Sequence, residues 1–180
     1  MASIGRNISV EPVVGKEDDP YALQEADLPV LKAEYERLAE YLRDHPETNF
    51  FHFNVDLAQG PCVIKRLRGC GAGCEYVAIT PEGDIYPCHQ FVGNEDYKLG
   101  SLYDGTFDQE LSGRFAGLNI YTREECRDCW ARFYCSGGCS ASNLLVNGDI
   151  KKPHRVGCEL ERKRLECAIA LRAIAAGMAE

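Results

Sequence analysis

The sequence has no long apolar run and no excess of basic residues. No stretch approaches the roughly 20 apolar residues that a membrane-spanning helix needs, so none is predicted. The chain carries 20 Lys and Arg against 28 Asp and Glu, a net charge of −8, whereas nucleic-acid binding requires clustered basic residues. Residues 1–6 contain no basic segment followed by an apolar core, and no signal peptide is predicted. These absences favour a cytoplasmic protein that binds neither nucleic acid nor membranes.

Several catalytic signatures are also missing. The sequence contains no glycine-rich phosphate loop, no serine–histidine–aspartate order and no paired-carboxylate site. It has no internal repeat or low-complexity stretch. Its 180 residues, 45% hydrophobic and 27% charged, are typical of one globular domain or one domain with a short appendage. The unusual feature of the composition is therefore its cysteine content.

The chain has ten cysteines, all in its last two-thirds. They stand at positions 62, 70, 74, 88, 126, 129, 135, 139, 158 and 167. In a secreted chain an even number of cysteines indicates disulfides, but in a reducing compartment thiolates more often bind metal. The sequence therefore favours metal ligation over disulfide bonding.

The densest group is Cys126-x2-Cys129-x5-Cys135-x3-Cys139. The C-x2-C pair lets two thiolates reach one metal centre from a single turn, and the segment 136–138, Ser-Gly-Gly, leaves the backbone free to wrap closely around it. Thiolate-rich sites select zinc or iron–sulfur clusters over hard cations. Spacing alone leaves both possibilities open, because four cysteines also make a tetrahedral zinc site.

A second group of cysteines brackets a predicted β-hairpin. Cys70, Cys74 and Cys88 lie on either side of it, and Cys158 stands at the head of the predicted final helix. With the first group they make eight thiolates, enough for two complete four-cysteine sites. Of the two cysteines left over, Cys167 lies on the apolar side of the final helix, which predicts a buried core residue.

The expected fold class is α+β. A β-branched run predicts a strand at 8–14, and helical spacing of apolar residues predicts a helix over 28–43. The segments 76–80 and 84–86 flank Pro-Glu-Gly and predict a hairpin, and 159–176 predicts a C-terminal helix. The architecture is then a short βα unit followed by a small domain of one hairpin, irregular cluster-binding loops and a final helix.

Three stretches carry a resemblance to a known family. CGAGCEYVAITPEGDIYPCHQFVGNEDYKLGSL at 70–102, CRDCWARFYCSGGCSAS at 126–142 and GCELERKR at 157–164 resemble the SPASM domain of radical-SAM maturases. Within that group they are most similar to the enzymes that form thioether crosslinks in cysteine-rich (SCIFF-type) precursor peptides. The resemblance implies a segment, 1–49, like the last βα unit of a radical-SAM barrel, and a SPASM-like domain, 50–180, that binds two [4Fe–4S] clusters.

The resemblance also implies interleaved ligands. The first cluster would take Cys70, Cys74, Cys88 and Cys139, and the second Cys126, Cys129, Cys135 and Cys158. Spacing near the first cysteine varies in the family, so the place of Cys74 has two alternatives. Either Cys62 serves instead, or the first cluster keeps an open iron that a substrate thiolate would bind.

The chain lacks the C-x3-C-x2-C motif that holds the catalytic cluster of radical-SAM enzymes. Val77 and Ser142 stand where the third cysteine of such a motif would follow Cys74 and Cys139. The chain therefore resembles the cluster-bearing C-terminal portion of such an enzyme and is not expected to be catalytic alone. One implied partner is a radical-SAM barrel that binds S-adenosylmethionine and is either a missing part of this protein or a separate chain. The other is a cysteine-rich precursor peptide.

Two functions from other classes remain open. The same thiolates would serve a structural zinc scaffold, which predicts a colourless protein without redox activity. They would also serve a ferredoxin-like electron carrier that works with unrelated partners. Under either cluster-binding hypothesis, the aromatic residues Trp130, Phe133 and Tyr134 are expected to form an apolar shell that excludes water from a cluster.

Overall fold

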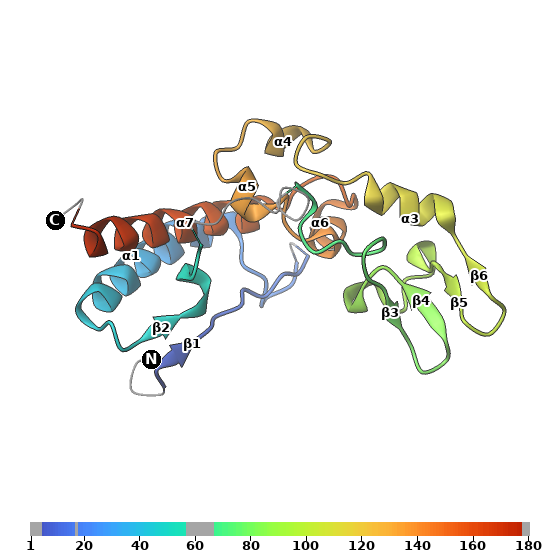
Figure 1. Ribbon diagram of the computed structural model, residues 1–180, viewed down its shortest axis with the longest axis horizontal. Helices are drawn as coiled ribbons and strands as arrows, with labels where there is room; N and C mark the ends of the chain where they lie inside the picture. The colour runs from blue at the N-terminus through green and yellow to red at the C-terminus, as the bar shows by residue number, and fades with distance from the viewer. Residues whose placement is uncertain (1–4, 17, 57–66, 178–180) are drawn as a thin grey trace. The chain divides into compact units, whose positions relative to one another are not determined.

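The computed structural model describes residues 5–16, 18–56 and 67–177 of the chain. It divides into two compact units (Figure 1). The first unit combines residues 1–60 with 154–180, and the second comprises residues 61–153. The first unit thus combines the final helix with the N-terminal segment. The division into segments 1–49 and 50–180 concerns family resemblance and stays a prediction.

The first unit contains a small parallel β-α-β arrangement. Strand β1 (Asn7–Ile8) pairs with β2 (Asn49–Phe50), and helix α1 (Leu28–Asp44) lies between them in sequence. Parallel neighbours need such a crossover because a tight turn cannot join them. The strand predicted at 8–14 is wrong beyond Ile8, since residues 9–14 have no regular secondary structure. Pro12 has no amide hydrogen to donate to a ladder, which disfavours a continuous strand there.

Helix α1 occupies the predicted segment. The short helix η1 (Glu25–Asp27) precedes it, and the Gln24 amide donates to the Asp27 carboxylate at 2.9 Å. Pro29 lies in the first turn of α1, where its missing amide costs no helical hydrogen bond. The helix ends at Asp44, before Pro46, as expected for a residue that cannot continue a helix.

Helix α7 (Arg155–Ala175) packs along α1 within the first unit (Figure 1). It begins at Arg155 and not at Glu159 as predicted. Beneath it, Phe50 is 2% exposed and its ring meets that of Phe53, in the short helix η2 (Phe51–Phe53), edge-on at 4.9 Å. Cys167 belongs to the same core and is 5% exposed, so its predicted role as a core residue is confirmed. Burial raises the pKa of its thiol.

The second unit contains a four-stranded antiparallel sheet in the order β3-β4-β5-β6. The predicted hairpin is confirmed as β3 (Ala78–Ile79) and β4 (Asp84–Tyr86). The short helices η3 (His89–Phe91) and η4 (Glu95–Tyr97) precede β5 (Gly100–Ser101) and β6 (Thr106–Phe107). Strands of two or three residues contribute few ladder hydrogen bonds, so side-chain packing must stabilise this unit as well.

Further short helices of the second unit lie within the described residues 109–147. They are α3 (Gln109–Ala116), α4 (Glu124–Arg127), α5 (Arg132–Cys135) and α6 (Ser140–Asn147). Asp108 caps α3 by accepting from the Leu111 amide at 2.8 Å. The core brings Phe91 and Leu99 together with Phe115 of α3. The predicted α+β fold class is therefore observed. Among the helices in the described ranges, none is apolar over a length that would cross a bilayer.

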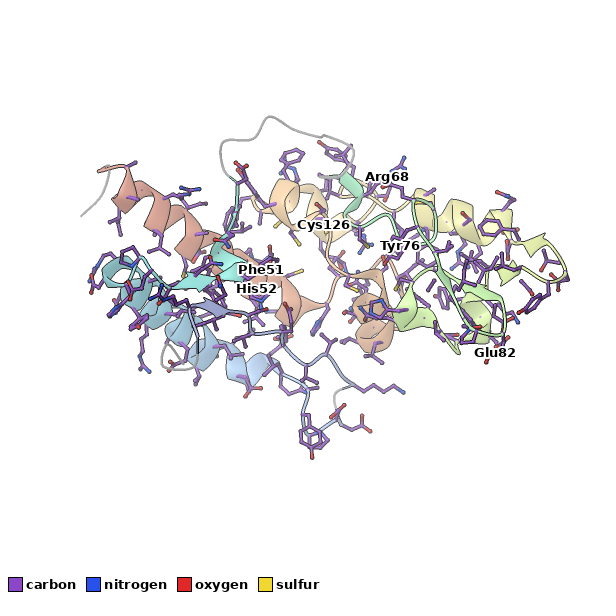
Figure 2. All side chains as sticks on the ribbon, turned by 60° about the horizontal axis from the view of Figure 1, so that its bottom comes forward. Phe51, His52, Arg68, Tyr76, Glu82 and Cys126 are labelled. Carbon is purple, nitrogen blue, oxygen red and sulfur yellow. The ribbon has the colours of Figure 1, made fainter. Side chains whose placement is uncertain are left out.

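Two neighbouring phenylalanines provide a matched test of the apolar core of the first unit, which contains Phe50, Phe53 and Cys167. Phe50→Ala is expected to lower the free energy of unfolding by about 3–5 kcal/mol, because it removes a fully buried ring and leaves a cavity. Phe51 is 64% exposed and is labelled in Figure 2, so Phe51→Ala is expected to change stability by no more than about 0.5 kcal/mol. Urea unfolding followed by circular dichroism measures both. Equal losses for the two variants would contradict the packing described here.

Candidate metal centre

The predicted cluster ligands are concentrated in the second unit. All of them except Cys158 lie there, and Cys158 lies in the first turn of α7 in the first unit. Its amide donates to the His154 carbonyl oxygen at 3.0 Å, so the helix fixes its backbone. The assignment of Cys158 to the second cluster remains a prediction. Cys62, the alternative ligand of the first cluster, falls outside the residues that the structure describes.

The glycine-rich loop 69–74 carries the first two cysteines. Gly73 adopts a left-handed backbone with φ +79°, and a Cβ atom on it would stand 2.8 Å from the ring of Phe115. Only glycine therefore fits here without strain. The Gly73 amide donates to the Pro87 carbonyl oxygen at 3.0 Å. This contact holds the loop beside the end of β4, directly before Cys88.

The phenol of Tyr76 connects two of the predicted ligands. Arg68 and Tyr76, labelled in Figure 2, flank the glycine-rich loop. The Tyr76 side chain forms hydrogen bonds with the thiols of Cys88 and Cys70. Burial is the main cause that raises the pKa of Tyr76, and the two sulfur groups raise it further. The structure thus brings Cys70 and Cys88, 18 positions apart in sequence, to one hydroxyl group.

Cys74 and Cys139 lie close to this pair. The Cys74 thiol donates to the Gly71 carbonyl oxygen at 3.4 Å. Burial, followed by the Glu75 carboxylate, raises its pKa, and Cys70 is near enough to contribute. Gln90, two residues after Cys88, directs its amide nitrogen to the Cys139 sulfur at 3.8 Å.

The second unit therefore gathers the four residues assigned to the first cluster around the loop, the end of β4 and the start of α6. Gly69 links this region to the 126–139 segment, because the site of its absent Cβ atom is 3.5 Å from Ser136. The loop thus lies against the turn that separates Cys135 from Cys139.

The segment 126–139 folds as a series of tight turns. Cys126 lies in α4, Cys135 ends α5 and Cys139 directly precedes α6. The Cys129 amide donates to the Cys126 carbonyl oxygen at 3.1 Å, as expected for a C-x2-C turn. Residues 136–138 then have φ values of 58°, 89° and 71°. Three successive left-handed residues thus separate Cys135 from Cys139, which confirms the backbone freedom predicted for Ser-Gly-Gly.

A buried arginine, absent from the sequence prediction, is fixed inside this turn. Arg123 is 4% exposed. Its Nη1 donates to the Gly137 carbonyl oxygen at 2.8 Å and its Nη2 to the Ser140 hydroxyl at 2.9 Å. A Cβ atom on Gly137 would stand 3.2 Å from the Arg123 Cδ atom, so the glycine makes room for the side chain. The sequence signal is slight, a single arginine three positions before Cys126.

Arg123 lies among the cysteine thiols. Burial lowers its pKa, whereas Cys126, Cys135 and Cys139 act in the opposite direction and would favour its charged form as thiolates. A guanidinium stays protonated in proteins, so this is a positive charge removed from water. Such a charge is costly to bury unless an anion lies beside it.

Two orphaned donors test whether an anionic group fits this region. Within the described part of the chain, the buried Nε atoms of Arg123 and Arg132 have no hydrogen-bond partner. Thiolates and the sulfides of an iron–sulfur cluster are acceptors for such donors, and thiolate ligands favour soft metals. The nine cysteines in the described ranges are present as thiols and not as disulfides. The donor set therefore fits an anionic thiolate-bound cluster.

No group of three or more His, Cys, Asp or Glu side chains in the described ranges is arranged to hold a single metal ion.

The aromatic shell predicted around the cysteines is wrong for two of its three residues. Trp130 is 48% exposed and Tyr134 is 38% exposed. Phe133 is half-buried and packs against the guanidinium of Arg132, 4.8 Å from its ring centre. Because α5 has four residues, it presents too short a face to bury every aromatic side chain near it.

The comparisons with known proteins agree with this geometry. Residues 70–130 match the family model described as SPASM, an iron–sulfur cluster-binding domain. The mycofactocin maturase MftC of Mycobacterium ulcerans is 32% identical over 111 residues, 58% of this chain and 29% of that protein. The PqqA peptide cyclase of Xanthomonas axonopodis pv. citri is 28% identical over 102 residues, 53% of this chain and 27% of that protein. The chain thus spans less than a third of the length of these relatives.

The fold has a counterpart among solved structures. The structure titled "Native anSMEcpe with bound AdoMet and Kp18Cys peptide" superposes with a TM-score of 0.60 at 20% identity, over 93% of this chain and 48% of that one. The class of the molecule is thus an α+β fold seen in about half of a larger protein. Residues 70–130 are similar to the SPASM iron–sulfur cluster-binding domain, and the chain is similar in sequence to part of a maturase and of a peptide cyclase.

Alkylation of the cysteines tests the ligand assignment. In the metal-free chain, iodoacetamide is expected to modify the exposed Cys70 and Cys139 fastest and Cys167 slowest, because burial shields Cys167 and disfavours its thiolate. In the cluster-loaded chain, the ligands are expected to be protected, Cys74 among them. Peptide mass spectrometry measures each site, and full modification in urea provides the control. Protection of Cys62 with modification of Cys74 would instead assign Cys62 to the first cluster.

Proposed function

We propose that this chain is the auxiliary-cluster portion of a radical-SAM enzyme that modifies a ribosomally made peptide. It would hold two [4Fe–4S] clusters, the first on Cys70, Cys74, Cys88 and Cys139, and the second on Cys126, Cys129, Cys135 and Cys158. The observation that carries the proposal is the gathering of the cysteines in the second unit around Tyr76 and Arg123. Soft thiolates assembled beside buried cationic donors favour an anionic cluster.

The backbone supports the interleaved pattern of ligands. Cys135 and Cys139 are close in sequence, yet the pattern assigns them to different clusters. Three successive left-handed residues, 136–138, separate them, so that their thiols need not share one centre. Gln90, two residues after Cys88, lies against Cys139, and this contact supports the assignment of Cys139 to the first cluster.

The proposed role of the chain is to hold and tune redox groups. When bound, [4Fe–4S] clusters supply one-electron transfer. The Tyr76 hydroxyl, already in contact with the thiols of Cys70 and Cys88, would donate to their thiolates and stabilise them. Such hydrogen bonds and the burial of the sulfurs tune cluster potential. In the whole enzyme, the clusters that these residues hold would accept the surplus electron as the product forms.

The proposed substrate class rests on the relatives. One is a maturase, another is a peptide cyclase, and the related structure contains a peptide and AdoMet. We propose that this chain acts with a radical-SAM barrel that binds S-adenosylmethionine, in a reducing cytoplasm. The finer proposal, thioether formation in a cysteine-rich precursor, rests on the resemblance of the cysteine stretches to SCIFF-type maturases.

Metal analysis of the chain purified without oxygen tests cluster binding. The expected result is about eight irons and eight sulfides per chain, with a brown chromophore that dithionite bleaches. Zinc and protein are measured in the same samples. About two zincs per chain and no colour would overturn the redox function and leave a structural zinc scaffold.

Single cysteine variants test the division into two centres. Cys88→Ser and Cys129→Ser are each expected to lose about half of the iron, because each removes a ligand from one proposed cluster. Cys167→Ala is the matched control, since Cys167 lies in the first core, and it should keep the full iron content. Loss of all iron in either ligand variant would contradict two independently held clusters.

The neighbouring genes test the role in peptide modification. The parent reading frame or an adjacent gene is expected to encode a barrel with C-x3-C-x2-C, together with a short cysteine-rich peptide. Deleting the peptide gene should leave the iron content of the chain unchanged while abolishing the modified product in extracts analysed by mass spectrometry. Finding neither gene would favour the ferredoxin-like carrier.

A further inference from the structure

Arg123 has a position that cluster ligation by cysteine alone does not require. It is one of the few charged side chains buried in the described part of the molecule. Two hydrogen bonds, to the Gly137 carbonyl oxygen and the Ser140 hydroxyl, fix both terminal nitrogens of its guanidinium. Its Nε atom has no acceptor among the described residues. The side chain is therefore held at both terminal nitrogens, and its Nε donor is unpaired among the described residues.

The thiols whose charge would act on Arg123 belong to both proposed clusters. Cys126 and Cys135 are assigned to the second, and Cys139 to the first. These three groups act on the guanidinium more strongly than Asp149, the carboxylate with the largest effect on it. Among the described residues, no ion pair joins Arg123 to a carboxylate. The anionic sulfur ligands of the proposed clusters would therefore be the groups that compensate the positive charge of Arg123.

We propose that Arg123 is a cationic contact shared by the two clusters, held in place by Gly137 and Ser140, and that it raises the reduction potential of both. The inference rests on the proposed function, because it requires both clusters to be bound. A [4Fe–4S] cluster with four thiolates gains one negative charge on reduction. A fixed positive charge nearby therefore stabilises the reduced form more than the oxidised form. Arg123 would act as a positioning and tuning residue and not as a ligand.

Charge-matched variants of the full chain test the proposal. The variants are Arg123→Gln, which removes the positive charge, and Arg123→Lys, which keeps the charge but lacks the two terminal guanidinium nitrogens. Arg127→Gln is the control, because Arg127 lies in the same segment but is exposed to solvent, where its charge is screened. Iron and sulfide are counted first, and dithionite titrations followed by absorption and electron paramagnetic resonance then give both midpoint potentials.

The expected result is a shift of both potentials to more negative values in Arg123→Gln, larger than in Arg127→Gln, with Arg123→Lys between Arg123→Gln and wild type. Unchanged potentials at full iron content would overturn the inference while leaving the proposed function intact. A shift in one cluster alone would overturn the shared contact. A wild-type chain without iron would overturn the proposed function itself.

A further variant keeps the inference testable if Arg123→Gln fails to load clusters. Ser140→Ala retains the charge of Arg123 but removes the acceptor that holds its Nη2 atom. A smaller shift in the same direction is then expected, because the guanidinium is less firmly placed. Wild-type potentials in both Ser140→Ala and Arg123→Lys would then overturn the inference that Arg123 raises the reduction potentials, and its role would be purely structural.

Discussion

The hydrogen bond from the Gly73 amide to the Pro87 carbonyl oxygen is the contact on which the arrangement of the first cysteines depends. It joins a loop that has almost no regular secondary structure to a strand of three residues. Because a Cβ atom on Gly73 would meet the Phe115 ring, the same glycine also lets the loop approach the core. Backbone pairing and core packing thus meet at one residue, and they place Cys70 and Cys88 within reach of the Tyr76 hydroxyl.

The second unit shows how little regular structure such a site requires. Its strands and several of its helices are shorter than five residues, although side chains from them share one apolar core. Isolated elements of this length are marginal in water. Where a bound centre crosslinks distant loops, the binding free energy also contributes to folding. A unit of this kind would then owe part of its stability to the group that it holds, which distinguishes it from the first unit, where α1 and α7 pack along each other.

Local sequence signals predicted much of this structure. The apolar spacing over 28–43, the Pro-Glu-Gly turn and the run leading to Cys167 each determine their element through contacts between near neighbours, and each prediction is confirmed. The strand predicted at 8–14 depended instead on a distant partner, β2, which pairs with Ile8 and with none of the residues 9–14. The exposure of Trp130 and the burial of Arg123 likewise depend on how non-adjacent turns pack. No propensity of the single residue carries that information, and the division of the cysteines between clusters remains a prediction for the same reason.

Gly137 extends the effect of Arg123 to a position that carries no side chain. A Cβ atom at 137 would stand 3.2 Å from the Arg123 Cδ atom and 3.3 Å from its Nε atom, so a larger residue would press on that side chain, and the left-handed backbone there restricts the choice further. Positions 123 and 137 are therefore tied to each other. Within a lineage, a bulkier residue at 137 would be tolerated only together with a shorter one at 123. A substitution at 137 that carries no charge would thus change the residue at 123 and, with it, the positive charge beside the cysteines. Related chains that differ at 137 would therefore also be expected to differ in the reduction potentials of their clusters.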